Sequence, residues 1–419
     1  MREGKKKVYV WGTGIYGRKA LGAINIEKCE ILGFIDNDQN KQGSEIEGHP
    51  VTSFHNISGN CDYIVVTVRN YVSVLHQIEL EKVRLLSKVI AFYDEEYVDN
   101  PKYKEVIHSD KWRIALLEYK LKRMEEILEW RVGNLGYEIV DKLEKGHYWY
   151  PKMGDTKDAI DKIVNNGCSM IRFGDGEFQL MAGFDRPVFQ RCEEKLSEGL
   201  KKAIQYKHDK LLIGIAKNYG ELDEYAEHYA DGIREYMSER VRNFHRSVLT
   251  DDRVYYDAYM FKCYLPYKDK ESTEERFNLV KRIWEKRDVI LIEGEYTRTG
   301  QGNDLLDNAK SVKRLLAPSK NAFSAYEQIL QEALKLPKDA LILMALGPAG
   351  KVLAIDLIEA GYQVVDIGQI DTSYECYKVG KGIEVPILNK NVSYMSHMQI
   401  CEIDDKKYFN QIIGKIEAK

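Results

Sequence analysis

Five short apolar runs alternate with longer stretches of mixed charge in the last two thirds of this 419-residue chain. Runs of this length separated by helical stretches are typical of buried strands, so the alternation predicts an α/β sheet. Ligands of such sheets bind beyond the carboxyl ends of the strands, which makes the residues after each run the first candidates for a site. The runs cover residues 169–173, 211–216, 288–293, 340–346 and 363–367.

The first run leads directly into a cluster of glycines and acids, Ile171-Arg-Phe-Gly-Asp-Gly-Glu177. Its two carboxylates, Asp175 and Glu177, are separated by one glycine. Carboxylate oxygens suit Mg²⁺ or Mn²⁺, which complete their coordination with phosphate and water. Arg172 adds a candidate phosphate ligand. Gly-Asp-Gly is also common turn chemistry, so the heptapeptide alone fits either a metal-diphosphate site or a surface turn.

Residues 294–304 follow the third run and are rich in glycine and hydrogen-bonding groups. Backbone N–H groups in such a loop can cradle a diphosphate, and Arg298 can bind phosphate oxygens. We expect a helix over residues 305–316 that carries Lys310, Lys313 and Arg314. Some of these cations could neutralise phosphate, although a solvated helix face is the alternative for Lys310.

The last two runs also end in polar groups. Gly347-Pro-Ala-Gly-Lys351 precedes a predicted helix, whose free N–H groups could hold an anion, although a plain turn is equally compatible. The final run is followed by acids that could bind sugar hydroxyls, support a metal, act as a base or cap a helix. These residues are Asp366, Gln369, Asp371 and Glu375.

The amino-terminal part predicts a small Rossmann-like domain. An apolar run at residues 7–12 enters Gly12-Thr-Gly-Ile-Tyr-Gly17 before an amphipathic stretch, which is a G-x-G-x-x-G turn in its usual context. The next run ends at Asp36, where a dinucleotide-binding fold presents an acid to a ribose. The glycines could instead form a tight strand-helix turn without a ligand. Further strands are expected at residues 29–35, 49–52, 63–68 and 88–92.

Residues 110–145 predict a helical connector, because apolar residues recur there at intervals of three and four. Its apolar stripe fits a core contact or a homodimer contact. The expected domains are therefore an accessory domain at 1–97, a connector at 98–149 and a second domain at 150–419.

Composition excludes several classes of function. A net charge of -4 and a pI of about 6.2 lack the basic character of a nucleic-acid-binding protein. The seven cysteines are scattered without a Cys-x-x-Cys pair, which indicates no zinc site or disulfide framework and favours the cytoplasm. Because no apolar segment is long enough to span a bilayer, we expect membrane association to be peripheral at most.

Several of these motifs occur in one order that resembles the GT-D fold glycosyltransferases, a bacterial family first catalogued as a domain of unknown function. The resemblance covers about residues 150–400. Residues 6–95 resemble the Rossmann-like accessory domain of sugar enzymes. The carrying motifs are Arg172-Phe-Gly-Asp-Gly-Glu177, Gly294-Glu-Tyr-Thr-Arg298, Gly302-Asn-Asp304, Asp307-Asn-Ala-Lys-Ser-Val-Lys-Arg314, Pro318-Ser-Lys-Asn-Ala-Phe323, Gly347-Pro348 and Asp366-Ile-Gly-Gln-Ile-Asp371.

The resemblance implies transfer of a sugar, typically glucose from UDP-glucose, to a glycan on a bacterial surface protein or polysaccharide, with Mn²⁺ or Mg²⁺. Its Asp-x-Glu motif maps onto Asp175 and Glu177 as ligands of the metal and the nucleotide diphosphate. The other implied binding residues are Arg172, Arg298, Lys313, Arg314 and Gly347 for the phosphates, and Asn303 and Asp304 for the sugar.

One position departs from the family pattern, since Gln369 stands where a histidine is often found. Glutamine cannot act as a base. If that histidine transfers a proton, this protein either uses a carboxylate, with Asp304, Asp371 and Glu375 as the candidates, or differs in acceptor or activity. A nucleotide-sugar-binding regulatory protein without turnover is the alternative. A dehydrogenase or epimerase that uses residues 12–17 for NAD is disfavoured, because no Tyr-x-x-x-Lys pair accompanies the first domain.

Overall fold

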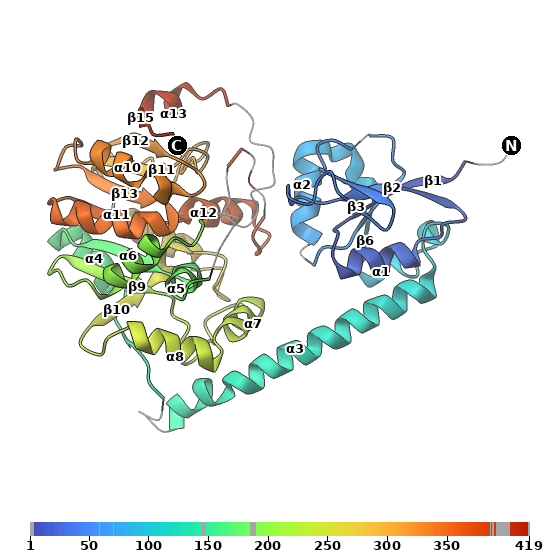
Figure 1. Ribbon diagram of the computed structural model, residues 1–419, viewed down its shortest axis with the longest axis horizontal. Coiled ribbons are helices and arrows are strands. Elements are labelled where there is room, and N and C mark those ends of the chain that lie inside the picture. Colours follow the sequence, from blue (N-terminus) through green and yellow to red (C-terminus); the bar gives the residue numbers. More distant parts are fainter. Residues whose placement is uncertain are drawn as a thin grey trace. The chain divides into compact units, whose positions relative to one another are not determined.

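A computed structural model describes residues 4–57, 59–69, 71–143, 148–184, 190–385, 387, 389–390 and 403–417. They belong to two compact units, one reaching Leu128 and the other beginning at Glu129 (Figure 1). Both are α/β, as the alternation of apolar runs predicts. Among the described residues, no helix is both long enough and apolar enough to cross a bilayer.

The first unit contains a six-stranded sheet in the order β3-β4-β2-β1-β5-β6. Its strands pair in parallel, apart from the antiparallel pair β3 and β4. The predicted strands are confirmed to within two residues, and fully buried Val8, Val10, Phe34 and Ile90 fill the core. The elements are β1 (Lys6–Trp11), α1 (Ile15–Ala23), β2 (Cys29–Ile35), β3 (Glu45–Ile46), β4 (His49–Thr52), β5 (Tyr63–Val66), α2 (Tyr71–Lys82), β6 (Val89–Ala91) and the 3-10 turns η1 (Val83–Lys88), η2 (Glu95–Tyr97) and η3 (Pro101–Tyr103).

The second unit is built on a nine-stranded sheet in the order β15-β12-β11-β13-β14-β8-β9-β10-β7. Every pair in it is parallel, so the carboxyl ends of all its strands lie at one edge. The strands are β7 (Lys152–Met153), β8 (Ser169–Phe173), β9 (Leu211–Ile215), β10 (Val254–Asp257), β11 (Asp288–Gly294), β12 (Ser311–Ala317), β13 (Leu341–Ala345), β14 (Gln363–Asp366) and β15 (Ile412–Lys415).

Helices connect and cover these strands. Among them, α11 contacts α6, α10 and the strands β8, β13 and β14, and its buried Leu353, Ala354 and Leu357 belong to the main core. The helical elements are α4 (Thr156–Asn166), α5 (Asp175–Met181), α6 (Glu194–Gln205), α7 (Glu227–Tyr236), α8 (Glu239–Val248), η4 (Ala258–Phe261), α9 (Thr273–Lys281), η5 (Ala322–Ala325), α10 (Tyr326–Ala333), α11 (Gly347–Glu359), α12 (Ile370–Val379) and α13 (Lys406–Gln411).

The helix predicted over residues 305–316 is wrong. Residues 301–310 form turns, and Ser311–Ala317 is strand β12, paired along its whole length with β11. The spacing of the leucines at 305, 306, 315 and 316 is compatible with a helix. The charged residues Lys313 and Arg314 interrupt the apolar run that would otherwise have indicated a buried strand. Because side chains alternate across a strand, Lys313 is exposed while Arg314 is buried.

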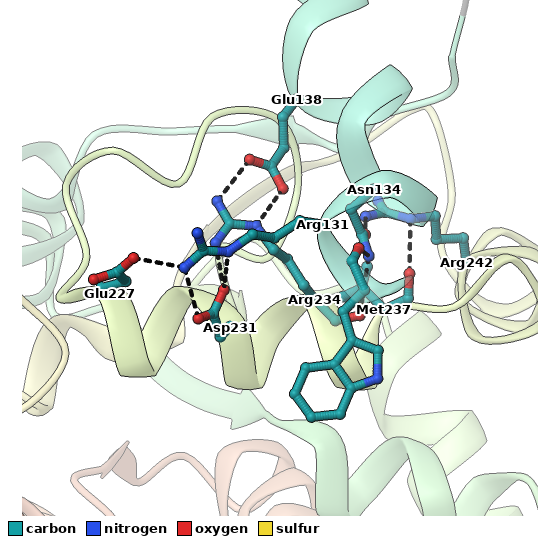
Figure 2. A network of polar contacts seen from close by, with 9 residues as sticks. Arg131, Asn134, Glu138, Glu227, Asp231, Arg234, Met237 and Arg242 are labelled. Atoms are coloured by element: carbon teal, nitrogen blue, oxygen red, sulfur yellow. Dashed lines mark hydrogen bonds and ion pairs between the residues drawn. The ribbon is translucent and has the colours of Figure 1, made fainter. Parts of the chain in front are cut away.

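The predicted connector is confirmed as a helix, α3 (Ser109–Leu143), of 35 residues. Within the second unit, its carboxyl-terminal half is fixed to α7 and α8 by polar contacts (Figure 2). Arg131 binds Asp231 at 2.9 Å, Arg234 binds Glu138 at 2.7 Å, and Arg242 donates to the Asn134 amide oxygen at 2.7 Å. This face of the helix is therefore held against the second unit by directional contacts.

Candidate active site

The candidate site lies at the carboxyl edge of the nine-stranded sheet, where β8 and β14 are neighbours. From β8 the chain proceeds outward through β9 and β10, whereas β14, β13 and β11 occupy the other side. This reversal of direction is a topological switch point, the usual place for a ligand in an open parallel sheet. Only Met170 and Val365 are in register between β8 and β14, so the residues beyond them are available to form a site.

Arg172, the penultimate residue of β8, bridges this junction. Its Nε donates to the Asp366 carbonyl at 2.7 Å, Nη1 donates to the Ala258 carbonyl at 2.7 Å, and Nη2 lies 3.4 Å from Asp366 Oδ1. Three of the five guanidinium donors are thereby used inside the protein. The structure gives Arg172 a positioning role between strands, and its predicted contact with phosphate would depend on the two remaining donors.

Gly368 makes this arrangement possible. Its φ is +50°, and a Cβ added there would lie 2.1 Å from Arg172 Nη2. We expect Gly368→Ala to destabilise the protein by about 1–3 kcal/mol, because it combines left-handed backbone strain with displacement of a fixed guanidinium. Gly380→Ala is the matched control in thermal unfolding, since Gly380 has φ +73° and open space around it. Equal losses of stability in the two variants would contradict the role given to Arg172.

Lys351, in the first part of α11, lies between two carboxylates at the same junction. Its Nζ is 3.2 Å from Glu177 Oε1 and 3.1 Å from Asp366 Oδ2, an ion-pair contact rather than a well-directed hydrogen bond. Burial lowers the pKa of Lys351, but the charges of Asp366 and Glu177 outweigh burial and raise this pKa. Burial likewise raises the pKa of Asp366, and Lys351 and Arg172 reverse the effect and lower it. Both groups are therefore charged at neutral pH.

Asp175 and Glu177 occupy the first turn of α5. Glu177 Oε2 accepts a hydrogen bond from the Gly174 N–H at 2.9 Å, and its other oxygen faces Lys351. Among the described residues, no three His, Cys, Asp or Glu side chains are grouped so as to hold a metal ion. Two carboxylates fit an ion that takes its remaining ligands from phosphate and water, and they do not form an all-protein cage.

A second cluster joins the loop after β11 to α12. Asp371 Oδ1 accepts from the Gly300 N–H at 2.9 Å and from the Asn303 amide at 2.8 Å, while Asp371 Oδ2 lies 2.7 Å from Lys390 Nζ. Glu375 Oε1 binds the same amide and the same ammonium, at 2.7 and 2.8 Å. Burial raises the pKa of Asp371. With both of its oxygens engaged, Asp371 is placed to hold the loop in position.

Asp304 has a more open environment. Its carboxylate is 55% exposed, and its Oδ1 accepts from Tyr374 OH at 2.9 Å and lies 3.4 Å from Lys378 Nζ. The hydrogen bond from Tyr374 lowers the pKa of Asp304, so this group is a carboxylate at neutral pH. Of the three acids predicted as bases, Asp304 is therefore the most accessible to a substrate.

The other three predicted phosphate ligands, Arg298, Lys313 and Arg314, differ in their environments. Arg314 is 2% exposed and binds Glu293 at 2.5 Å, the Thr299 carbonyl at 2.8 Å and Gln411 at 2.8 Å. Arg314 thus stabilises the loop after β11 through the Thr299 carbonyl, and its buried guanidinium is engaged with protein groups instead of a ligand. Exposed Lys313 is four residues before the end of β12, roughly 13 Å from the carboxyl edge at ~3.3 Å per residue. Arg298 is buried and donates to the Asn389 carbonyl at 2.9 Å.

Two cations of these clusters were not among the predicted site residues. Lys351 had a signal in the sequence, because it ends the Gly-Pro-Ala-Gly-Lys turn after a strand. Lys390 had none, since it is separated in sequence from every motif, although it lies beside Asp371 and Glu375. Gln369 precedes the first residue of α12, so the expected histidine position is at the amino end of that helix.

In the first unit, the glycine-rich turn is explained by close packing. A Cβ on Gly17 would lie 2.0 Å from the Gly12 carbonyl oxygen, and Gly12 has φ +109°. Asp36 Oδ2 accepts from the Thr13 N–H at 3.2 Å and from the Thr13 hydroxyl, and it faces Lys41 at 3.4 Å. The acid expected to bind a ribose is therefore turned toward the turn itself. This geometry accounts for the motif without a dinucleotide.

The fold and this edge define a parallel α/β domain with a cluster of charged residues at a topological switch point, and comparison with known proteins specifies the class. Residues 170–395 match the family described as "Glycosyltransferase GT-D fold", and residues 4–85 match "C2185-like, N-terminal". A solved structure titled "The highly conserved domain of unknown function 1792 has a distinct glycosyltransferase fold" is 35% identical, with a TM-score of 0.60 over 64% of this chain and 96% of its own. The structure titled "A New Glycosyltransferase (DUF1792) from Streptococcus sanguinis" is 30% identical, with a TM-score of 0.60 over 64% of this chain and 100% of its own.

Two curated relatives carry the same domain. "Glycosyltransferase GlyD" of Streptococcus pneumoniae serotype 4 (strain ATCC BAA-334 / TIGR4) is 34% identical over 62% of this chain, and "Probable glycosyl transferase Gly" of Streptococcus gordonii is 30% identical over 62%. The matches span 32% and 38% of those proteins, about a third of their lengths. This chain belongs to the GT-D fold glycosyltransferase family.

Proposed function

We propose that this chain is a metal-dependent glycosyltransferase that moves a sugar from a nucleotide-sugar donor to a glycan in surface glycoprotein or polysaccharide biosynthesis. A UDP-linked donor and glucose are the first candidates, as the family resemblance implies. The observation that carries the proposal is the position of Asp175 and Glu177 in the first turn of α5, directly after β8 at the switch point, with Glu177 paired to Lys351. Family membership supports the class of reaction.

The proposed donor site is assembled from groups at this edge. Asp175 and Glu177 would hold Mn²⁺ or Mg²⁺, which supplies charge neutralisation at the donor diphosphate when bound. The amino end of α11, which begins at Gly347, offers free N–H groups and a positive dipole end to the same anion. Lys351 adds a buried ammonium beside these groups, and a preorganised cation stabilises charge on a departing nucleotide.

The loop after β11 would orient the sugar and the acceptor. Asn303 is fixed by Asp371 and Glu375, so the loop is held without bound substrate. Asp304 is the proposed base for an acceptor hydroxyl, because it is an exposed carboxylate with one oxygen outside its contacts with Tyr374 and Lys378. Asp371 and Glu375 then act as positioning residues. A phosphate contact by Arg298 stays a prediction.

A panel of nucleotide sugars tests this proposal. The purified chain is incubated with UDP-glucose, UDP-galactose, UDP-N-acetylglucosamine and GDP-mannose, each with Mn²⁺ or with EDTA, and release of free nucleotide is measured. We expect one donor to be hydrolysed in Mn²⁺ and release to be abolished by EDTA. Equal release with and without metal would contradict metal dependence, and release from no donor, even with glycan acceptors present, would contradict transferase activity.

One observation favours a second function. Lys351 already neutralises Glu177, and Gln369 replaces a residue that could act as a base. A regulatory protein that binds a nucleotide sugar without turnover would need neither a metal nor a base. Saturable binding of one donor, with no nucleotide release in the panel, is the result expected of that alternative.

A further inference from the structure

Helix α3 carries a continuous stripe of exposed apolar side chains, which we call the apolar seam. Eight of the seventeen large apolar side chains found exposed among the described residues lie on this one helix. All eight are between 43% and 68% exposed. An exposed apolar patch of this kind marks an interaction surface. The seam consists of Ile114, Leu117, Leu121, Met124, Leu128, Val132, Leu135 and Ile139.

The spacing of the seam is that of a coiled coil. Successive seam residues are three or four positions apart. This spacing places two seam residues in every seven, which is the heptad repeat of a coiled coil. A stripe restricted to these two positions is narrower than the face by which a helix usually joins a globular core. One additional step of four, from Leu128 to Val132, is a stutter that coiled coils accommodate by local unwinding.

The contacts that the helix makes within its own chain leave the seam exposed. In the first unit, Trp112, Ala115 and Leu116 are the buried residues of α3. In the second unit, Arg131, Asn134 and Glu138 bind α7 and α8 (Figure 2). In the second unit Leu135 lies one turn from both Arg131 and Glu138, so the seam runs beside these contacts. Its residues remain at least 43% exposed.

The charged residues beside the seam indicate which kind of helix binds to it and in which direction that helix runs. With Ile114 at heptad position a, Arg113 and Lys120 occupy g positions, and Glu118 and Glu125 occupy e positions. In a parallel pair of helices g faces e of the partner, which places Arg113 opposite the partner's Glu118 and Lys120 opposite the partner's Glu125. An antiparallel pair would place like charges together.

These charged residues also make contacts within the first unit. Arg113 binds Asp99 at 2.6 Å, and Lys120 and Glu118 bind Glu95 and Lys19. All of these pairs are exposed to solvent, where an ion pair contributes little to stability and can exchange partners. The existing contacts are therefore compatible with pairing to a second helix.

A membrane surface fits the seam less well. Over residues 109–143, seven Lys and Arg are balanced by seven Asp and Glu. Helices that lie on anionic membranes carry an excess of Lys and Arg on their polar face. We propose that α3 pairs in parallel and in register with α3 of a second copy of this chain, through the apolar seam, to form a homodimer.

The test uses the full-length chain. Light scattering coupled to size exclusion is expected to give twice the 48.5 kDa mass of one chain. Leu121→Glu combined with Leu128→Glu should give the single-chain mass, because it raises the dimer dissociation constant roughly 100-fold or more by burying unpaired charges. Leu334→Glu, at an exposed leucine outside α3, is the matched control and should remain dimeric. Circular dichroism confirms that each variant is folded.

Cross-linking tests the orientation. In a parallel pair in register, Leu121 faces the partner's Leu121, so Leu121→Cys should form an oxidised dimer well above the background of the wild-type cysteines. Lys122→Cys, one residue outside the seam, should not. A wild-type chain that is monomeric at about 100 µM, or that is monomeric and floats with anionic vesicles, would overturn the proposal. A dimer that withstands the double substitution, or that fails to cross-link through Leu121→Cys, would also overturn it.

Discussion

Asp175→Asn is expected to reduce metal-dependent release of nucleotide by about 10²–10³-fold, the range found when one group that stabilises a transition state is removed. Asparagine keeps the size of the side chain but removes the charge that a divalent cation requires. Asp175 begins α5 and is half-buried, so the fold should tolerate the change. Glu177→Gln should have a similar effect on activity, with some additional loss of stability because Glu177 also binds Lys351.

The matched control for Asp175→Asn is Asp158→Asn, which makes the same change in the first turn of α4. Asp158 is exposed and pairs with Lys162, away from the β8 and β14 junction. Nucleotide release by this variant should equal that of the wild type. If Asp175→Asn and Glu177→Gln both retained wild-type turnover, the assignment of the metal and diphosphate to α5 would be wrong.

Lys351→Met is expected to produce the largest loss of stability. It leaves the buried Asp366 carboxylate facing Glu177 without the ammonium between them. Removing one partner of a buried ion pair costs about 3–5 kcal/mol when the other charge is left uncompensated. Because Arg172 stays 3.4 Å from Asp366, we expect a loss near the lower end of this range. At ~2–4 °C per kcal/mol, the Tm of the second unit should fall by several degrees or more in calorimetry. Lys310→Met is the control, since the exposed Lys310 pairs with Asp288 at the surface.

The pH dependence of this cluster follows from the two pKa shifts. The pKa of Asp366 is lowered by folding, so its contribution is present above an unfolded value of about 3.9 and is lost as pH falls through the folded pKa. The pKa of Lys351 is raised, so its contribution is present below about 10.4 and is lost as pH rises through the folded pKa. Without Lys351, burial should raise the pKa of Asp366 above its unfolded value, so the stability deficit of Lys351→Met should shrink as pH falls from 7 to 4 and this carboxyl becomes protonated. A deficit that is independent of pH would contradict this explanation.

Ten of the fifteen strands could be predicted from the sequence because they form distinct apolar runs, whereas β3, β7, β10, β12 and β15 were not predicted. The position of the site followed from the same pattern, since Asp175, Glu177, Gly347 and Asp371 all come directly after predicted strands. Strand β12 could not be predicted in this way. Its Arg314 owes its burial to Glu293 on the neighbouring strand, and local periodicity contains no information about that partner.

The roles of individual side chains depended on contacts across long distances in sequence. Arg172 is separated by 194 residues from Asp366, whose carbonyl and carboxylate it binds. Lys390 reaches Asp371 and Glu375 from outside every recognisable motif. A motif predicts that polar groups gather at one edge of the sheet. The tertiary structure decides which of these groups face a ligand and which bind one another. For that reason Asp304 and Asp371, equal as candidate bases in the sequence, differ in the structure.

We propose that the donor diphosphate binds with a metal ion at the junction of β8 and β14. Calorimetric titration of UDP into the wild-type chain and into Asp175→Asn, each with Mn²⁺ and with EDTA, tests it most directly. We expect the wild type to bind UDP at least about tenfold more tightly with Mn²⁺, a difference of about 1.4 kcal/mol, and Asp175→Asn to lose this gain. Equal affinity of the two proteins for UDP in Mn²⁺ would contradict the claim.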